Sequence, residues 1–307
     1  MTVRTIISGE RGETAPLEPE LATPVEVVEP VGVACPLVLS SPHSGAIYPR
    51  RFLASSRLDS ATLRRSEDAY VDELFEGAIA LGAPMARARF PRAYLDVNRE
   101  PFELDPRMFE GKLPAHVNTR SLRVAAGLGT IARLVAEGEE IYRQPLTLAS
   151  ALERINCLYL PFHAALARLL EETRKRFGYA VLIDCHSMPS SPALPSSGAR
   201  PDVVLGDRFG ASCDPRIARF LRTTMTDLGY EVDLNRPYAG GYITEHYGKP
   251  YRGIHAVQVE INRGLYMDEI SYRPSSGYGL LARDLDTLCR RLTQDLPQIL
   301  ERRAAAE

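Results

Sequence analysis

Two strand-like apolar runs, at residues 35–43 and 179–186, each end in a histidine. These are His43 and His186, and a third apolar run further along the chain contains Glu260. In an α/β sheet, the carboxyl ends of the strands line the crevice where ligands bind. Two imidazoles and a carboxylate at that edge are what a catalytic metal and its general base require. The pattern therefore predicts a metal-dependent hydrolase.

Each of these side chains also has an ordinary structural interpretation. A single histidine after a strand is more often a solvated loop residue, and only the matched placement of His43 and His186 favours metal binding. Asp184 precedes His186 by two residues on the same strand face, so it is suited equally to orienting that imidazole and to a structural hydrogen bond. Glu260 is compatible with a general base and with a buried ion pair to an arginine such as Arg263.

A zinc site needs a third protein ligand and an open position for water. Glu67 and Asp68 both lie near the apolar side of a predicted helix over residues 61–81. A carboxylate there must be paired or bound, because burial of a bare charge is costly. On spacing alone, a salt bridge to Arg64 or Arg65 is the simpler explanation.

Two arginines are candidates for substrate binding. Arg92 and Arg99 flank a short predicted strand at residues 93–97. A guanidinium group binds a carboxylate through two parallel hydrogen bonds, so an arginine beside a metal site suggests an acidic substrate. In a chain with 37 lysines and arginines, each of the two is also compatible with a solvated surface position.

The composition of the 307-residue chain is that of an ordinary globular protein, with 45% hydrophobic and 25% charged residues. A net charge of −2 favours neither nucleic acid nor an anionic membrane as a partner. No apolar stretch is long enough to span a bilayer, and the N-terminus lacks the pattern of a signal peptide, so we expect a cytoplasmic protein. The five cysteines form no CxxC pair, and Cys185 is expected to be a buried spectator because it faces away from His186.

Alternating strands and helices predict a single α/β domain with a mixed, mostly parallel sheet flanked by helices. Residues 1–30 contain several prolines and are expected to form an extended leader, with the catalytic domain at residues 31–307. The predicted helices cover residues 61–81, 129–144, 148–177, 215–228 and 278–302. The predicted strands lie near residues 37–43, 85–90, 93–97, 179–187, 202–205, 230–233 and 255–263.

Over roughly residues 35–300, the chain resembles the N-formylglutamate amidohydrolase family. None of the matching motifs is specific alone, but so many motifs in the same order are specific for the family. The matching segments are Ser41-Pro42-His43-Ser44-Gly45, Glu67-Asp68-Ala69-Tyr70-Val71-Asp72, Asp96-Val97-Asn98-Arg99-Glu100-Pro101, Ile183-Asp184-Cys185-His186-Ser187, Gly240-Gly241-Tyr242-Ile243-Thr244 and Gln258-Val259-Glu260-Ile261-Asn262-Arg263.

The resemblance implies a fold like that of zinc carboxypeptidases and one zinc ion held by His43, His186 and a carboxylate. Carboxypeptidases have their acidic ligand three residues after the first histidine, which is Ala46 here. The third ligand therefore falls most naturally on Asp68, with Glu67 as the alternative.

The resemblance also implies the remaining roles. Glu260 matches the catalytic glutamate, and Asn98 with Arg99 matches the pair that recognises a substrate carboxylate, with Arg99 or Asn98 also stabilising the oxyanion. Arg92 and Gly241 are further candidates for substrate contact. The implied reaction is hydrolysis of a small molecule, N-formyl-L-glutamate, to formate and L-glutamate.

Two alternatives remain open at the level of sequence. One is a metal-dependent deacylase or carboxypeptidase-like enzyme that acts on another N-acyl amino acid or a short peptide. The other is a non-catalytic relative that keeps the fold as a binding module. The joint presence of His43, Asp68, His186 and Glu260 argues against the second alternative. Manganese, iron and cobalt are alternatives to zinc, since such donor sets accept several divalent ions.

Overall fold

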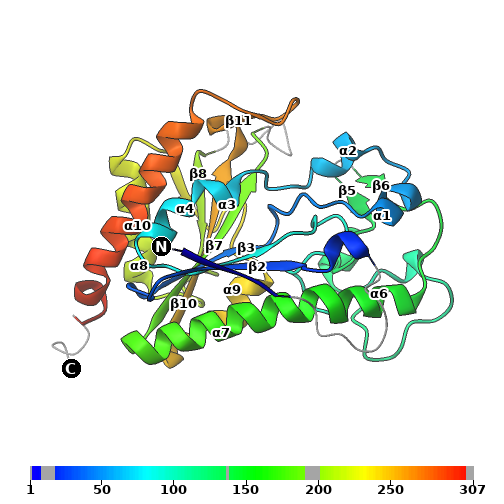
Figure 1. Cartoon of the computed structure of the whole chain (residues 1–307), viewed down its shortest axis with the longest axis horizontal. Helices are drawn as coiled ribbons and strands as arrows, with labels where there is room; N and C mark the ends of the chain where they lie inside the picture. The colour runs from blue at the N-terminus through cyan, green and yellow to red at the C-terminus, as the bar shows by residue number, and fades with distance from the viewer. Residues whose placement is uncertain (1, 8–17, 136–137, 191–200, 302–307) are drawn as a thin grey trace.

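The computed structural model describes residues 2–7, 18–135, 138–190 and 201–301, and an eight-stranded sheet lies at its centre (Figure 1). In spatial order the strands are β1 (Thr2–Ile7), β2 (Val25–Pro30), β4 (Met85–Ala88), β3 (Leu37–Ser41), β7 (Ala180–Met188), β10 (Ile254–Asn262), β8 (Val203–Gly206) and β9 (Val232–Leu234). The four central strands, β4, β3, β7 and β10, run parallel to one another. Strands β1, β2 and β4 pair antiparallel, as do β8 and β10. The predicted mixed α/β sheet is confirmed.

Helices cover both faces of this sheet. The helices of the described residues are α1 (Arg50–Ser55), α2 (Ser60–Arg64), α3 (Val71–Leu74), α4 (Glu76–Ala80), α5 (Leu122–Ala125), α6 (Leu148–Arg154), α7 (Leu160–Phe177), α8 (Pro215–Asp227), α9 (Tyr242–Tyr247) and α10 (Tyr278–Glu301). Helix α7 packs on one face, whereas α3, α4, α8 and α10 pack on the other (Figure 1). Two small hairpins complete the described structure, one of β5 (Leu134–Val135) and β6 (Glu139–Glu140) and one of β11 (Met267–Asp268) and β12 (Arg273–Pro274).

Strand β7 has one mainly apolar face and one face that becomes polar towards its carboxyl end. Successive strand residues point to opposite faces. Val181, Ile183 and Cys185 therefore join the core under α8 and α10, which confirms Cys185 as a buried bystander. On the other face, apolar Leu182 is followed by Asp184 and then His186 towards the carboxyl end of the strand. Polar side chains thus collect at one edge of an otherwise apolar layer.

The expected leader over residues 1–30 is wrong for its described part. Strand β2 pairs antiparallel with β4 inside the central sheet, and β1 pairs with β2. Val25 and Val27 are fully buried in the core on the α7 face, and Val28 is buried on the other. Burial of these valines outweighs the breaking tendency of the prolines, because Pro24 and Pro30 stand only at the ends of the strand.

The single helix expected over residues 61–81 is also wrong, because it is broken into α2, α3 and α4. Tyr70 adopts a left-handed conformation with φ 65°, which no helix accommodates. The N–H of Asp68 donates to the carbonyl of His43 instead of to a helical partner. Glu67 and Asp68 consequently lie in a loop between α2 and α3.

Two further elements differ from expectation. The helix expected over residues 129–144 is replaced, in its described part, by the short β5–β6 hairpin. Its apolar residues, including Ile131 and Ile141, are nevertheless fully buried. The strand expected at residues 93–97 is a turn in which the Tyr94 N–H donates to the Pro91 carbonyl. The helices near 148–177, 215–228 and 278–302 are confirmed, the first with a π-helical turn at Ile155–Tyr159.

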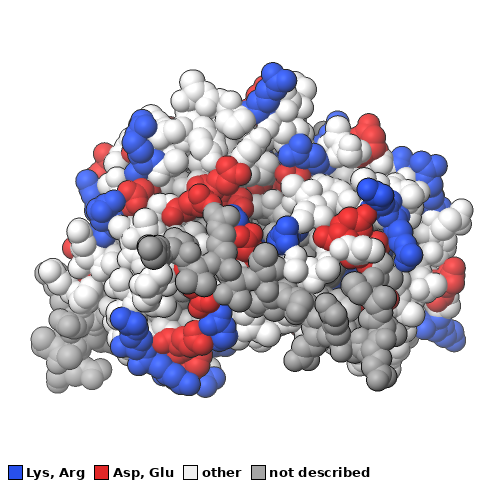
Figure 2. Space-filling view, in the orientation of Figure 1, with Lys and Arg blue, Asp and Glu red and all other residues white. Residues whose placement is uncertain are grey.

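The surface mixes both signs of charge. On the face shown in Figure 2, basic and acidic side chains stand side by side rather than forming a region of one sign. Arg168, for example, pairs with both Glu29 and Glu172. Among the helices of the described residues, none has the length and apolar character needed to cross a bilayer.

Candidate metal and catalytic site

Three neighbouring strands deliver the candidate residues to one edge of the sheet. His43 follows the end of β3 by two residues, and His186 lies near the end of β7. Glu260 on β10 is the register partner of His186 on β7, so both side chains emerge side by side from the same face. The parallel order of these strands brings together residues that are far apart in the chain.

The loop after β3 is fixed by close backbone packing. A Cβ atom on Gly45 would collide with the carbonyl oxygen of Phe90, so only glycine fits at this position. The Ile47 N–H donates to the Arg89 carbonyl in the same region. These contacts hold the His43 loop, whose carbonyl in turn accepts the N–H of Asp68 at 3.0 Å.

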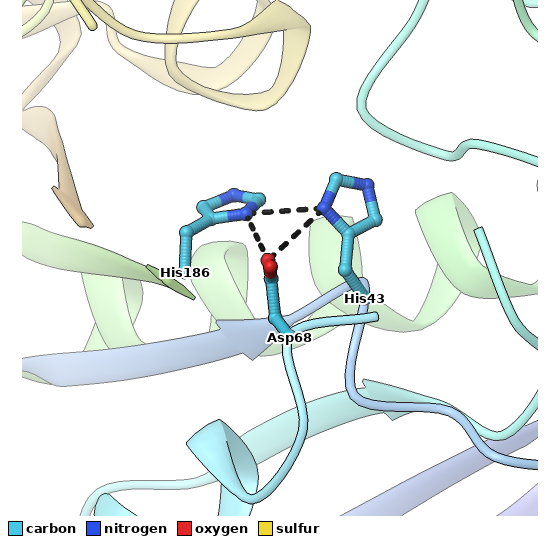
Figure 3. Close-up of side chains that lie close together, drawn as sticks. All are labelled: His43, Asp68 and His186. Atoms are coloured by element: carbon cyan, nitrogen blue, oxygen red, sulfur yellow. Dashed lines mark hydrogen bonds and ion pairs between the residues drawn. The ribbon is translucent and has the colours of Figure 1, made fainter. Parts of the chain in front are cut away.

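His43, Asp68 and His186 point their polar atoms at a common point (Figure 3). The two histidine Nδ1 atoms lie 3.1 Å apart. Oδ2 of Asp68 lies 3.1 Å from Nδ1 of His186 and 3.4 Å from Nδ1 of His43. All three side chains are buried, with at most 2% exposure. This is the arrangement of three protein ligands around one ion.

The outer nitrogens of both imidazoles face carboxylates. Nε2 of His43 lies 2.7 Å from Oδ1 of Asp96, and Nε2 of His186 lies 2.9 Å from Oδ2 of Asp184. A carboxylate oxygen only accepts hydrogen bonds, so each Nε2 carries a proton, and each Nδ1 is the nitrogen turned towards the common point. Two imidazole nitrogens and a carboxylate oxygen that converge on one point form a donor set that fits a divalent metal.

Asp68 is held as an anion by its second oxygen. Oδ1 accepts hydrogen bonds from Nη2 of Arg263 at 3.0 Å and from Oγ of Ser187 at 3.2 Å. Burial alone would raise the pKa of Asp68, but hydrogen bonds to His186 and His43 and the charge of Arg263 hold this pKa well below its ordinary value. The buried carboxylate is therefore ionised, as a metal ligand must be.

Asp96 is similarly charged, although it is not a ligand. Its Oδ2 accepts from Nη2 of Arg92 at 2.8 Å and lies 3.5 Å from Nη2 of Arg99. Burial would raise the pKa of Asp96, but the charges of Arg99, His43 and Arg92 keep it well below the ordinary value. Asp96 thus couples the two arginines to the orientation of His43.

Asn98 is fixed through its side-chain oxygen and through the backbone on either side of it. Its Oδ1 accepts the Ile243 N–H at 2.8 Å. The preceding carbonyl, of Val97, accepts from Nε2 of His163 at 2.9 Å. The carbonyl of Arg99, the residue after Asn98, accepts a hydrogen bond at 2.8 Å from the hydroxyl of Tyr159, which belongs to the π-helical turn before α7. Such turns often occur near functional sites, and this one anchors the segment that carries Asn98.

Glu260 has a different environment from the two ionised aspartates. Its Oε1 accepts from Nε2 of Gln258 at 2.7 Å, and Oε1 of Gln258 accepts the Gly241 N–H at 2.7 Å. Burial raises the pKa of Glu260, and the attraction of His186 only partly offsets this. Neighbouring carboxyl groups with pKa values displaced in opposite directions are typical of sites that divide binding and proton transfer between them.

These residues open onto one cleft with a volume of about 250 Å³. Its lining comprises His43, Arg92, Asn98, Arg99, Arg123, His186, Pro237, Tyr238, Ala239, Gly240, Gly241, Gln258 and Glu260. The structure therefore brings the predicted substrate-binding and catalytic residues to one cleft, and it places Asp68 against the two histidines. Glu67 is outside the cluster, because it pairs with Arg64 and accepts a hydrogen bond from Tyr48.

Three contributors were missed by sequence reasoning. Asp96 had an available signal, since it lies two residues before Asn98 in a matching motif. Arg263 was considered as a partner of Glu260, but its guanidinium group bonds to Asp68 and Ser187 instead. Arg123 had no signal in its local sequence, because a long loop brings it to the cleft.

Replacing Asp96 by asparagine tests the orienting bond to His43. With zinc as the probe ion, we expect Asp96→Asn to weaken binding at the His43–Asp68–His186 cluster by roughly 10- to 100-fold, because the amide keeps the shape of the carboxylate but not its charge. The affinity is measured by competition with a chromophoric chelator. Asp105→Asn is the control, since it removes an equally buried carboxylate that pairs with Arg107 and Arg133 away from the cluster. Equal zinc affinities in both variants would contradict the role of Asp96.

Comparison with known proteins finds relatives that match most of the chain. The sequence model of the family described as N-formylglutamate amidohydrolase matches residues 35–267. An N-formylglutamate deformylase of Pseudomonas putida is 31% identical over 268 residues, which cover 85% of this chain and 92% of the relative. The corresponding protein of Pseudomonas aeruginosa is 33% identical over 239 residues, or 76% of this chain and 83% of the relative.

Solved structures agree. The N-formylglutamate amidohydrolase from Ralstonia eutropha JMP134 superimposes with a TM-score of 0.84 at 35% identity, covering 90% of this chain and 99% of its own. A protein from Agrobacterium tumefaciens has a TM-score of 0.63 at 19% identity, covering 89% of this chain and 96% of its own. This second likeness shows a shared fold.

Proposed function

Because the chain belongs to the N-formylglutamate amidohydrolase family, a family of hydrolases that cleave linear amides, we propose that it hydrolyses N-formyl-L-glutamate to formate and L-glutamate with the help of one zinc ion. We assign the zinc ligands to Nδ1 of His43, Nδ1 of His186 and Oδ2 of Asp68. The observation that carries this proposal is the convergence of these three atoms, all within 4.8 Å of one another, beside Glu260 in one cleft.

Two nitrogens and one carboxylate oxygen are a donor set that suits zinc and leaves a coordination position open. When bound there, zinc supplies Lewis acidity that polarises an amide carbonyl and makes water a stronger acid. The protein contributes the rest of the chemistry through its own side chains. Asp96 and Asp184 keep both imidazoles in the tautomer that presents Nδ1 to the ion.

Glu260 is assigned as the general base and then the general acid. It accepts a proton from the water that attacks the formyl carbon, and it delivers that proton to the amino nitrogen as the C–N bond breaks. Its raised pKa suits this double role, because a proton carrier works best when its pKa lies near the working pH. The bond from Gln258 holds one carboxyl oxygen in place and leaves the other for the water.

Arg92, Arg99 and Asn98 are assigned to the substrate carboxylate and the developing oxyanion. Arg99 has its Nε and Nη1 engaged with the carbonyls of Leu128 and Asn98, so it mainly supplies positive potential from a fixed position. Arg92 donates a hydrogen bond from Nη2 to Asp96, and it also lines the cleft. A Cβ atom on Gly241 would collide with the Asn98 amide, so this glycine contributes by leaving room for Asn98.

A comparison of N-formyl-, N-acetyl- and N-succinyl-L-glutamate tests the proposal. We expect the zinc-loaded enzyme to favour the formyl substrate in kcat/KM, with formate and glutamate released in equal amounts. The same reaction after removal of zinc by a chelator should fall to background and return when zinc is added. A preference for a longer acyl group, or full activity without metal, would refute this assignment.

A further inference from the structure

We propose that Arg123 binds the side-chain carboxylate of the substrate and thereby selects acidic N-formyl amino acids over neutral ones. The inference rests on the proposed function and adds to it the residue that recognises the side chain of the substrate. Arg123 lies outside the family motifs recognised in the sequence, and it reaches the cleft from the short helix α5, which is part of a separate loop segment.

Three arginines, Arg92, Arg99 and Arg123, line the cleft, and Glu260 is the carboxylate among its described lining residues. Two of these arginines, Arg92 and Arg99, share the single carboxylate of Asp96. Burial lowers the pKa of Arg99, and repulsion from Arg92 and Arg123 lowers it further. A ligand with two negative charges would relieve this repulsion.

Arg123 is the member of the three with the loosest carboxylate contact. The ion pair recorded for it joins its Nη1 to Oε2 of Glu103 at 3.7 Å, which is beyond hydrogen-bond distance. Its side chain is 32% exposed, whereas that of Glu103 is only 5% exposed. The buried Glu103 therefore orients Arg123 without occupying its guanidinium group, and donors remain for a ligand.

The backbone around Arg123 is well fixed. Ser121 caps the short helix α5 by accepting the Val124 N–H at 3.1 Å, and the Leu128 N–H closes the following turn on the Arg123 carbonyl at 2.8 Å. A Cβ atom on Gly129 would collide with the carbonyl of Glu103, so the two segments are in close contact. A long side chain on such a base can be directed into a cleft with little loss of backbone entropy.

The connectivity of the substrate matches the order of the arginines. Asp96 ties Arg92 and Arg99 to the metal ligand His43, so these two lie nearest the reacting amide. The α-carboxylate is attached to the carbon next to the amide nitrogen and belongs beside them. The side-chain carboxylate lies two methylene groups further out. Arg123, which is tied to Glu103 rather than to any metal ligand, is the third arginine among the described residues of the cleft wall.

The test compares Arg123→Met with a matched control, Arg120→Met, in the zinc-loaded enzyme. Arg120 is an exposed arginine in the same loop and does not line the cleft. For N-formyl-L-glutamate, we expect Arg123→Met to lower kcat/KM by roughly 10- to 100-fold, as for loss of a charge-assisted hydrogen bond. For N-formyl-L-glutamine, which lacks the second charge, kcat/KM should change by no more than about twofold. Arg120→Met should leave both values unchanged.

Arg123→Lys keeps the charge but not the planar fork, and it should retain an intermediate preference for glutamate over glutamine. An unchanged preference in Arg123→Met would overturn the proposal. Binding of glutarate, measured by calorimetry, separates this outcome from failure of the proposed reaction. If the parent enzyme hydrolyses neither substrate, weaker glutarate binding in Arg123→Met still supports the anion site, and equal binding rejects it.

Discussion

Glu260→Gln should lower kcat by about 10²- to 10⁴-fold while leaving one zinc ion per chain in place. The amide has the size of the carboxylate and can still accept the hydrogen bond from Gln258. It cannot take a proton from water or return one to the leaving nitrogen. Because the metal ligands are untouched, the loss appears in turnover and not in metal content.

Stability provides an internal check on the Glu260→Gln variant. Burial already raises the pKa of Glu260, so a neutral side chain at this position removes a desolvation cost. We therefore expect a melting temperature at least as high as that of the parent. Glu245→Gln is the matched control, because Glu245 is an exposed residue on α9 that pairs with Arg208. Near-normal turnover in Glu260→Gln would eliminate Glu260 as the general base.

Asp68→Ala should abolish stoichiometric zinc binding and also destabilise the metal-free protein. The variant removes one of the three proposed ligands. It also leaves the guanidinium group of Arg263, which is 5% exposed, without its carboxylate. Breaking a buried ion pair in this way costs roughly 3–5 kcal/mol of unfolding free energy. The zinc content and the denaturant midpoint of the metal-free variant are the two measurements.

Two comparisons separate these effects of Asp68. In the double variant Asp68→Ala/Arg263→Met, the unpaired charge is removed, so much of the stability should return while zinc binding stays lost. Glu67→Gln changes the adjacent carboxylate, which pairs with Arg64 outside the cluster, and should retain zinc. If Asp68→Ala retained zinc and Glu67→Gln lost it, the third ligand would be Glu67 and the assignment to Asp68 would be wrong.

The site could be anticipated from the sequence because strands have strong local signals. The buried runs of β3, β7 and β10 are short, apolar and continuous, so their ends could be located closely. Parallel pairing then places the histidines and Glu260 at one edge without further information. The choice between Glu67 and Asp68 was different. That choice depends on which of the two carboxylates forms an ion pair with Arg263, and Arg263 is far from both in the sequence.

The helices predicted at residues 61–81 and 129–144 were wrong for the same physical reason. Hydrophobic periodicity reports burial, and Leu63, Val71 and Leu74 are indeed buried. Their backbone is nevertheless set by tertiary contacts, such as the bond from Asp68 to the carbonyl of His43. In the region expected as a helix at 129–144, Arg133 bonds to Asp105 across a loop, which a local pattern cannot indicate. Burial was thus predicted better than conformation.

The most direct test of the account is a crystal structure of the zinc-loaded protein with diffraction data on both sides of the zinc absorption edge. We predict one strong anomalous peak per chain, bonded to Nδ1 of His43, Nδ1 of His186 and Asp68, at about 2.0–2.2 Å from each ligand atom. Glu260 should lie next to the ion without bonding to it. A peak elsewhere, or one in contact with only one of the two imidazoles, would contradict the account.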